Sequence, residues 1–433
     1  MNAMRVARGA ASALLVVLTA GVPGRAEVAQ AGVPRVTQPN VPAADLQALV
    51  AGNNRFAEAV FARQPTGSNV FFSPYSLSAA LAMTYAGAKG ETARQMASAL
   101  DFSLPPERLH PAFDALDLAL ASRGTDRQSV RGTIPGFKIN VANALWGQTG
   151  RTFAPDFLNT LGANYGAGLR LLDFSAGDAA RVTINDWVAE QTAQRIKDLI
   201  PQGALSRDSR LVLTNAVYFL APWTSKFEPR ATADGPFQRL VGNAGTAFYQ
   251  TVQVPMMHQA AHFGYAAGEN WQAVELAYGS GQMSMVVLLP AAGQMPAVEQ
   301  TLATDGWDKL LAGLQPTHVE LTLPRFGLSS SLSLKEALGQ LGMKDAFDPR
   351  TADFSGMDGT RELSLGDVLH KTFLKVDENG TEAAAATAVI MVGSAFPANT
   401  VTMTVDRPFL FVIRDRPTGQ IVFMGRTVDP ASK

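Results

Sequence analysis

The stretch Glu378-Asn-Gly-Thr-Glu-Ala-Ala-Ala-Ala-Thr-Ala-Val-Ile-Met-Val-Gly-Ser394 is the most informative part of this chain. A run so poor in bulk and charge normally lies inside a fold, yet this one lies between two strand patterns. Upstream, Thr372 to Val376 alternates in polarity and leads into an Asp-Glu-Asn-Gly turn signal at 377–380. Downstream, Phe409 to Ile413 is continuous apolar sequence. The stretch therefore reads as a long connection between two strands.

The same stretch also has the pattern of a strand that has not yet formed. In a strand, alternate side chains share one face. The face that starts at Thr381 is uncharged throughout and consists of Thr381, Ala383, Ala385, Thr387, Val389 and Met391. The single charge after Gly380, Glu382, falls on the opposite face, where water could solvate it. The loop is thus able to enter a sheet, although an Ala-rich helix is the alternative because Ala is the best helix former.

Composition excludes several function classes. Lys plus Arg is 36 and Asp plus Glu is 37, which gives a net charge of -1 with no basic block suited to nucleic acid or polyanions. Cys is absent, so disulfides, thiolate metal sites and Cys nucleophiles are excluded. The 433 residues would usually form two or three domains, but no linker divides the interior, so residues 46–433 are predicted to form one domain.

The N-terminus has the pattern of an export signal. Arg5 and Arg8 precede the apolar run Ala10 to Ala20. This run is too short for a bilayer, which needs about 20 residues, and Gly24-Arg25-Ala26, with small residues at 24 and 26, follows it. The order of charge, apolar run and small residues is typical of a secretory signal peptide.

We therefore expect residues 1–26 to be removed, with cleavage after Ala31 as the second choice and a short membrane anchor as the alternative to secretion. Residues 27–45, rich in Pro and polar residues, are expected to be a flexible lead-in. The mature protein is expected to be extracellular or periplasmic, without membrane contact.

Two helices and a strand are predicted ahead of the loop. Ser73 is the expected N-cap of a helix over Pro74 to Ala86, with Pro at its first position. Apolar residues at three- and four-residue intervals predict a helix over Val182 to Ile200. Leu211 to Leu220 reads as a buried strand.

These segments resemble signatures of the serpin family, in unbroken order from Leu46 to Pro430. The matching stretches are residues 69–92, 184–196, 211–223, 254–257, 283–290, 323–326, 352–357 and 406–426. One departure is Leu220-Ala221-Pro222, where serpins usually have Lys-Gly. The resemblance implies an α+β serpin fold with a large mixed main β-sheet, additional sheets, surrounding helices and an exposed reactive-centre loop at about 378–400.

The resemblance also implies which loop residues act. Its hinge would comprise Glu378, Gly380, Thr381, Glu382, Ala383, Ala384, Ala385 and Ala386. The usual count from Gly380 places the reactive bond at Ser394-Ala395, and the variable loop length leaves Val392, Gly393 and Phe396 open as the specificity residue.

Polar residues within strand patterns are the other candidates for functional residues, outside the loop. The parity of His370 and Asn215 points both into apolar surroundings, where an unpaired polar group costs about 1 to 3 kcal/mol. Serpin resemblance assigns them, with Ser73 and Ser76, to the shutter beneath the opening strands, and Trp223 to the breach where the loop enters. Ordinary core roles are the alternatives.

The implied activity is suicide inhibition of a serine protease through a covalent complex, by a monomer that needs no cofactor. No zinc-protease spacing, Gly-x-Ser-x-Gly elbow or phosphate loop suggests an enzyme. The small residues 392–395 favour an elastase-like or subtilisin-like target over a trypsin-like one, and Met391 or Phe396 would suit a chymotrypsin-like pocket. Inhibition of a cysteine protease and a chaperone or carrier role are the alternatives.

Overall fold

Two sheets and the helices around them form the structure, a computed structural model that describes residues 26–29, 31–129, 132–134, 136–242, 248–381 and 400–432. The α-helices of these residues are α1 (Ala43–Phe61), α2 (Pro74–Tyr85), α3 (Gly90–Ala99), α4 (Pro106–Arg123), α5 (Pro155–Tyr165), α6 (Asp178–Gln191), α7 (Met295–Ala312), α8 (Lys335–Gln340) and α9 (Ser355–Asp358). This mixture of helices and largely antiparallel sheets is of the α+β class.

The main sheet has the order β1-β6-β5-β7-β15-β14-β13. Its strands are β1 (Glu27–Ala29), β5 (Lys138–Gln148), β6 (Leu169–Leu172), β7 (Leu211–Pro222), β13 (Phe326–Ser333), β14 (Val368–Asp377) and β15 (Gly380–Thr381). β5 pairs with β7 antiparallel, β7 with β14 parallel and β14 with β13 antiparallel. The sheet is therefore mixed, and its central parallel pair is the one that a further strand could separate.

The second sheet follows the path β16-β12-β9-β10-β11-β17-β18-β2, with β8 paired to β9. Its strands are β2 (Val70–Phe72), β8 (Ala233–Val241), β9 (Phe248–Gly268), β10 (Trp271–Tyr278), β11 (Met283–Pro290), β12 (Gln315–Pro324), β16 (Val401–Thr404), β17 (Phe409–Asp415) and β18 (Ile421–Thr427). β17 and β18 are consecutive along the chain and pair antiparallel. A further pair, β3 (Arg127–Ser129) and β4 (Gly132–Ile134), precedes β5.

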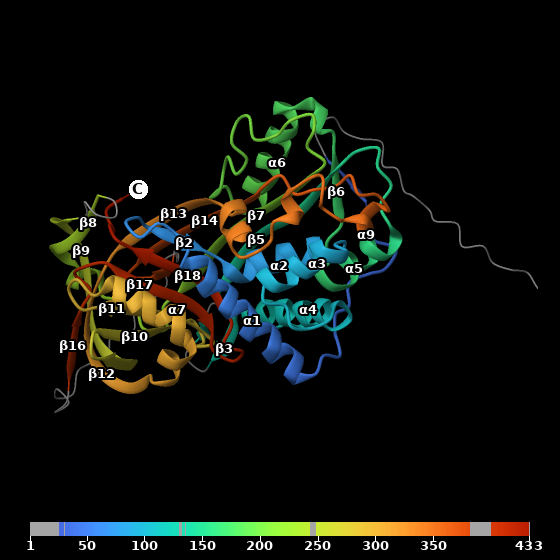
Figure 1. The fold of residues 1–433 in the computed structure, drawn as a ribbon. Coiled ribbons are helices and arrows are strands. Elements are labelled where there is room, and N and C mark those ends of the chain that lie inside the picture. Colours follow the sequence, from blue (N-terminus) through green and yellow to red (C-terminus); the bar gives the residue numbers. More distant parts are fainter. Residues whose placement is uncertain are drawn as a thin grey trace, which may run out of the picture.

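Helices cover both faces of the main sheet (Figure 1). On one face, Ala142, Ala144 and Trp146 of β5 pack against Ile184 and Val188 of α6. The opposite face lies over α2, where the odd-numbered residues of β5 point. The alternation of side chains along a strand thus separates an α6 side from an α2 side.

The helix pattern at 182–200 was only partly right. α6 begins earlier, at Asp178, and ends at Gln191. Ala193, Gln194 and Asp198 have positive φ, which an α-helix cannot contain. Asn185 instead holds the following loop, because its side chain accepts from the amide of Ile200 and donates to the carbonyl of that residue. Ile196, Leu199 and Ile200 are buried, but as part of a loop.

The N-terminal segment has more structure than the expected flexible lead-in. Residues 27–29 form β1 at the edge of the main sheet, paired with β6. Two glycines make room for it: a Cβ added at Gly162 would lie 2.2 Å from the Cβ of Ala31, and one at Gly168 would lie 2.6 Å from a methyl group of Val28. The composition of the segment gives no sign of these distant partners. Residues 1–25, which contain most of the predicted signal peptide, lie outside the described residues.

No helix in the described ranges is long and apolar enough to span a membrane.

Candidate functional site

The main sheet is open at one end and closed at its centre. At the open end, β15 lies between β7 and β14, with Thr381 opposite Val376 on one side and Ala221 on the other. At the centre, residues 368–373 of β14 pair directly with 213–218 of β7. The chain just before the 382–399 segment has therefore already entered the sheet by two residues.

Gly380 is required where β15 begins. Its φ of 145° is one that L side chains rarely adopt. A Cβ at this position would lie 2.2 Å from the carbonyl oxygen of Ala221 and 2.7 Å from the Cα of Pro222. Glycine alone lets the chain pass this close to the end of β7.

Thr381 points into the molecule and is fully buried. Its hydroxyl lies 2.7 Å from the hydroxyl of Tyr278, which is also buried. The Tyr278 ring stacks on Trp223, with ring centroids 4.3 Å apart and an interplanar angle of 10°. Burial raises the pKa of Tyr278, so its hydroxyl stays protonated and can hydrogen-bond to Thr381 at neutral pH.

Trp223 also holds the turn that leads into β15. Its indole nitrogen donates to the carbonyl of Asp377 at 2.9 Å, and its backbone amide donates to the carbonyl of Asn379 at 2.9 Å. Phe227 donates its amide to the carbonyl of Glu378 at 3.0 Å. The segment after β7 thus satisfies three carbonyls of the turn.

Glu378, within this turn, is buried, with only 4 % of its surface exposed. The Arg325 side chain donates to both of its carboxylate oxygens, at 2.8 and 2.9 Å, and the Thr232 hydroxyl donates at 2.5 Å. Burial opposes ionisation, but these hydrogen bonds outweigh it and lower the pKa of Glu378. The carboxylate is therefore charged and anchored at neutral pH.

At the closed centre, three polar side chains form a row across neighbouring strands. We call Asn143 of β5, Asn215 of β7 and His370 of β14 the central row, because the register aligns Asn143 with Asn215 and Asn215 with His370. The Asn215 amide donates to Asn143 at 2.6 Å, and its oxygen hydrogen-bonds to Nδ1 of His370.

The start of α2 supplies the remaining partners. Ser73 caps this helix and donates its backbone amide to Nε2 of His370 at 2.9 Å. Asn215 donates to both the hydroxyl and the carbonyl of Ser76, each at 2.8 Å. Helix and strands are joined by one buried hydrogen-bond network.

This network fixes the proton on His370. Nε2 accepts from Ser73, so Nδ1 carries the hydrogen and donates it to Asn215. Burial lowers the pKa of His370 to about 3, against a smaller raising effect of its hydrogen bond to Asn215. A second proton on Nε2 would face the Ser73 amide, donor against donor. The central row is therefore intact only with neutral His370.

A family model described as "Serpin (serine protease inhibitor)" matches residues 51–430. The chain belongs to the serpin family. Leukocyte elastase inhibitor A of Rattus norvegicus is 36% identical over 400 residues, covering 89% of this chain and 100% of the relative. An uncharacterised serpin-like protein of Thermococcus kodakarensis is 38% identical over 390 residues, covering 89% of this chain and 83% of the relative.

The serpin fold is equally clear in three dimensions. The thermophilic serpin tengpin, solved in its native state, matches with a TM-score of 0.79 and 27% identity over 94% of this chain and 100% of its own. The family model is described as one of serine protease inhibitors and the relative from Rattus norvegicus is named as an inhibitor, so this chain belongs to a family of protease inhibitors and not of enzymes.

The structure describes only part of the expected serpin loop. Glu378, Gly380 and Thr381 lie in the turn and β15, while residues 382–386 of the hinge and the expected reactive bond at 394–395, with its alternatives at 392, 393 and 396, lie outside the described residues. The expected shutter residues Ser73, Ser76, Asn215 and His370 come together, and Trp223 lies at the end of the sheet where β15 enters.

Sequence reasoning missed four partners in this serpin: Asn143, Tyr278, Arg325 and Thr232. Asn143 had a detectable signal, because a polar residue within a strand pattern calls for a buried partner. The others contact the hinge through side chains from distant elements, which no local pattern indicates.

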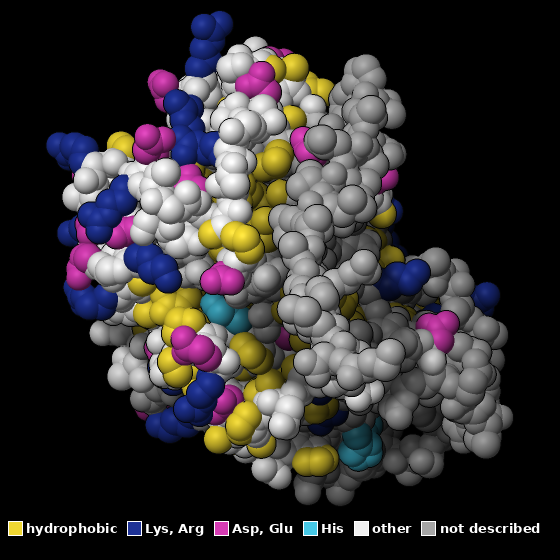
Figure 2. All heavy atoms as spheres, turned by 90° about the vertical axis from the view of Figure 1, so that its right-hand side faces the viewer, with side chains coloured by type: hydrophobic (Ala, Val, Ile, Leu, Met, Phe, Trp, Pro, Cys, Tyr) yellow, Lys and Arg dark blue, Asp and Glu magenta, His cyan; other side chains and the backbone are white. Residues whose placement is uncertain are grey.

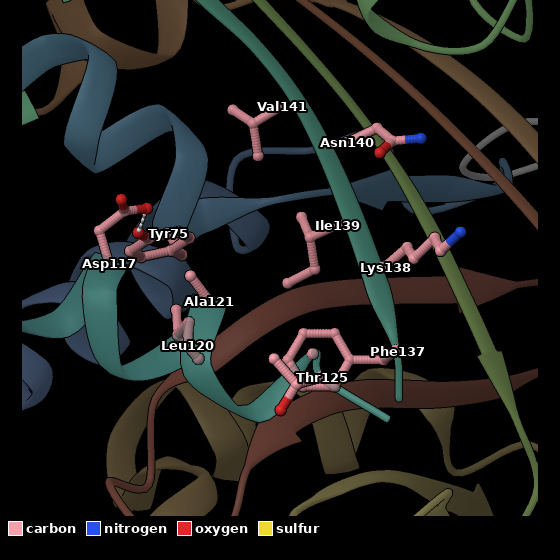
Figure 3. A pocket seen from close by; sticks show the side chains of 11 residues that line it. Tyr75, Asp117, Leu120, Ala121, Thr125, Phe137, Lys138, Ile139, Asn140 and Val141 are labelled. Carbon is pink, nitrogen blue, oxygen red and sulfur yellow. Dashed lines mark hydrogen bonds between the residues drawn. The ribbon is translucent and has the colours of Figure 1, made fainter. Parts of the chain in front are cut away.

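Other features of the described surface do not suggest a catalytic site. A cavity of about 290 Å³ lies between α4 and β5 (Figure 3), but its carboxylate, Asp117, is engaged by the Tyr75 hydroxyl and by Arg35. On the coloured part of the face seen in Figure 2, basic and acidic side chains are interspersed. Within the described residues, no group of three or more His, Asp or Glu is arranged to hold a metal.

Proposed function

We propose that this serpin is a suicide-type inhibitor of serine proteases, and that it acts as a monomer by inserting its cleaved loop into the main sheet. The observation that carries the proposal is β15, which lies between β7 and β14 in the intact chain. It gives insertion a defined start, with Thr381 already on the buried face.

The reaction would begin as ordinary proteolysis. The protease serine attacks the carbonyl of Ser394, the bond to Ala395 breaks, and the amine of Ala395 leaves with the proton taken from the serine. The ester then joins the protease to the new C-terminus. Insertion of the residues after Thr381 then carries the ester, and the protease with it, along the main sheet before water hydrolyses the ester, and the free energy released by insertion traps the acyl-enzyme.

We further propose an elastase-like or subtilisin-like target. Residues 392–395 are small, and no Lys or Arg occurs between Lys375 and Arg407. A shallow pocket accepts Ser, Ala or Val, whereas an acidic pocket would keep its carboxylate unpaired. The names of the leukocyte elastase inhibitors support the same target class.

Mixing the purified protein with elastase, subtilisin, chymotrypsin, trypsin and papain tests both proposals. We expect SDS-stable complexes with elastase or subtilisin and a released fragment that begins at Ala395. A fragment that begins elsewhere between 392 and 397 moves the bond, while simple cleavage without complex by every protease overturns the inhibitory proposal. Ser394→Arg is expected to redirect inhibition to trypsin, with Ser394→Ala as its conservative control.

We also propose secretion, which the charged and apolar pattern of residues 5–26 supports. Protein isolated from outside the producing cytoplasm is expected to begin at Glu27. A chain recovered there with residues 1–26 intact would contradict signal cleavage.

A further inference from the structure

Three of the five histidines of the chain lie on one outward-facing sheet surface. On β9 and β12, His262 is the direct cross-strand partner of His318, and His258 is opposite Thr322. The intervening residues Val319 and Leu321 point into the core and are fully buried. The histidines therefore share the opposite, solvent-facing side, and the proposed inhibitory mechanism uses none of them.

His262 and His318 have the spacing of two ligands on one metal ion. Their ring centroids are 5.2 Å apart. With Zn–N bonds of about 2.0–2.1 Å and tetrahedral angles, two imidazoles on one zinc ion have ring centroids about 5 Å apart. This spacing, with an interplanar angle of 75° between the rings, is compatible with two ligands on one ion.

The neighbouring strand fixes the ring of His318. Its Nδ1 lies 3.1 Å from the hydroxyl of Thr400 on the approach to β16. A hydrogen bond at Nδ1 orients the ring and leaves Nε2 as the coordinating atom, which is the usual arrangement around metal-binding histidines. His262 is exposed, so its ring is accessible to solvent.

We propose that His262 and His318 form a binding site for a divalent transition-metal ion of the zinc type, whose other positions are taken by water. Imidazole is a preferred ligand of zinc, copper and nickel, whereas calcium and magnesium prefer oxygen. The ion links β9 to β12 next to Thr400, where the described chain resumes after the 382–399 segment.

Titration calorimetry of the full mature protein with Zn²⁺ alone tests the site. We expect one ion per chain at neutral pH, and at least tenfold weaker binding in His262→Ala and in His318→Ala. Thr400→Val is expected to weaken binding by about tenfold, because losing the hydrogen bond that orients a metal-binding histidine typically costs 10- to 100-fold in affinity. Zn²⁺ should also raise the melting temperature of the wild type but not of the double alanine variant.

His258→Ala is the matched control, since His258 lies on the same face but bonds to Thr322 and lies 3.6 Å from Glu320. We expect its zinc affinity to stay within about twofold of the wild type, the variant being checked by circular dichroism. Unchanged affinity in folded His262→Ala and His318→Ala, a loss confined to His258→Ala, or no binding at millimolar Zn²⁺ each overturns the proposal. None of these outcomes affects the loop-insertion assay.

Discussion

The hinge and the centre of the main sheet, which both lie between β7 and β14, are stabilised in different ways. At the hinge, β15 already fills the gap: Thr381 of β15 bonds to Tyr278, Glu378 of the turn bonds to Arg325, and Trp223 donates to the turn. At the centre the strands pair directly, held by His370 and Asn215. The hinge thus prepares insertion, while the central row opposes it. A loop that enters the sheet must exchange the direct β7–β14 pairs for new ones.

Cutting the loop should have the largest effect on stability. It frees about a dozen residues to insert between β7 and β14, where they replace the direct pairing of these strands. Each new backbone hydrogen bond contributes a net of about 0.5–1.5 kcal/mol, so insertion is worth on the order of 10 kcal/mol. For a chain of this size that raises the melting temperature by about 10 °C. Calorimetry before and after limited proteolysis within 391–397 measures the shift. An equal or lower melting temperature would mean that the centre does not open.

Thr381→Arg should abolish inhibition by blocking the hinge. Thr381 is fully buried against Tyr278, and a buried, unpaired guanidinium costs several kcal/mol. We expect the variant to be cleaved normally but to form no SDS-stable complex. Thr381→Ser, which keeps the hydroxyl, is the control and should remain an inhibitor. Undiminished complex formation by the arginine variant would refute the assigned inward face.

The hinge and the centre also differ in how much of their structure the sequence predicted. Ser73 and Pro74 predicted the start of α2, and the parity of His370 and Asn215 predicted that both are buried. These are local signals, a helix cap and a strand period. Such signals can be recognised within a few neighbouring residues, and they predicted the main elements at the centre of the sheet.

What could not be predicted depends on contacts between distant segments. Arg325 reaches Glu378 from the chain just after β12, and Tyr278 reaches Thr381 from the second sheet. The early end of α6 depends likewise on Asn185, which bonds to the backbone 15 residues away. Apolar periodicity continues through that region because the loop also buries Ile196, Leu199 and Ile200, so period alone could not locate the end of the helix.

Acid should loosen the centre before the hinge. The pKa of His370 is lowered to about 3, whereas an unfolded His has a pKa of about 6.5. Between these values the unfolded chain binds the extra proton, so this contribution to stability is present above pH 6.5 and is lost as the pH falls. From pH 6.5 to 5 the loss is about 2 kcal/mol. The hinge carboxylate Glu378, with its lowered pKa, remains charged over this range.

Denaturant unfolding and hydrogen exchange at pH 7 and 5 test this order. His370→Gln should show a weaker pH dependence than the wild type and faster exchange of the β14 amides. His110→Gln is the matched control, because burial also lowers the pKa of His110, to about 4, away from the central row. It too should flatten the pH dependence but leave β14 exchange unchanged. Equal effects of both variants on β14 would remove any special role of the central row.

The smallest expected effect concerns the point where the inserted loop would meet the central row. Continuing the β15 register six residues along each strand brings Thr387 opposite His370 on β14 and Asn215 on β7. Insertion separates those two polar groups, and the Thr387 hydroxyl, on the same face as Thr381, could bond to one of them. Thr387→Val should therefore lower the melting temperature gained on cleavage by about 1 °C, since one neutral hydrogen bond contributes about 1 kcal/mol.

The isosteric valine keeps the shape and the strand tendency of Thr387, so the difference reports the hydroxyl alone. The control is Thr381→Val, which removes the hydroxyl that bonds to Tyr278 in the intact protein and should therefore lower stability before cleavage as well as after it. Thr387→Val should change only the cleaved form. If it destabilises the intact protein equally, or leaves the cleaved form unaffected, the inserted register differs from the one that β15 begins.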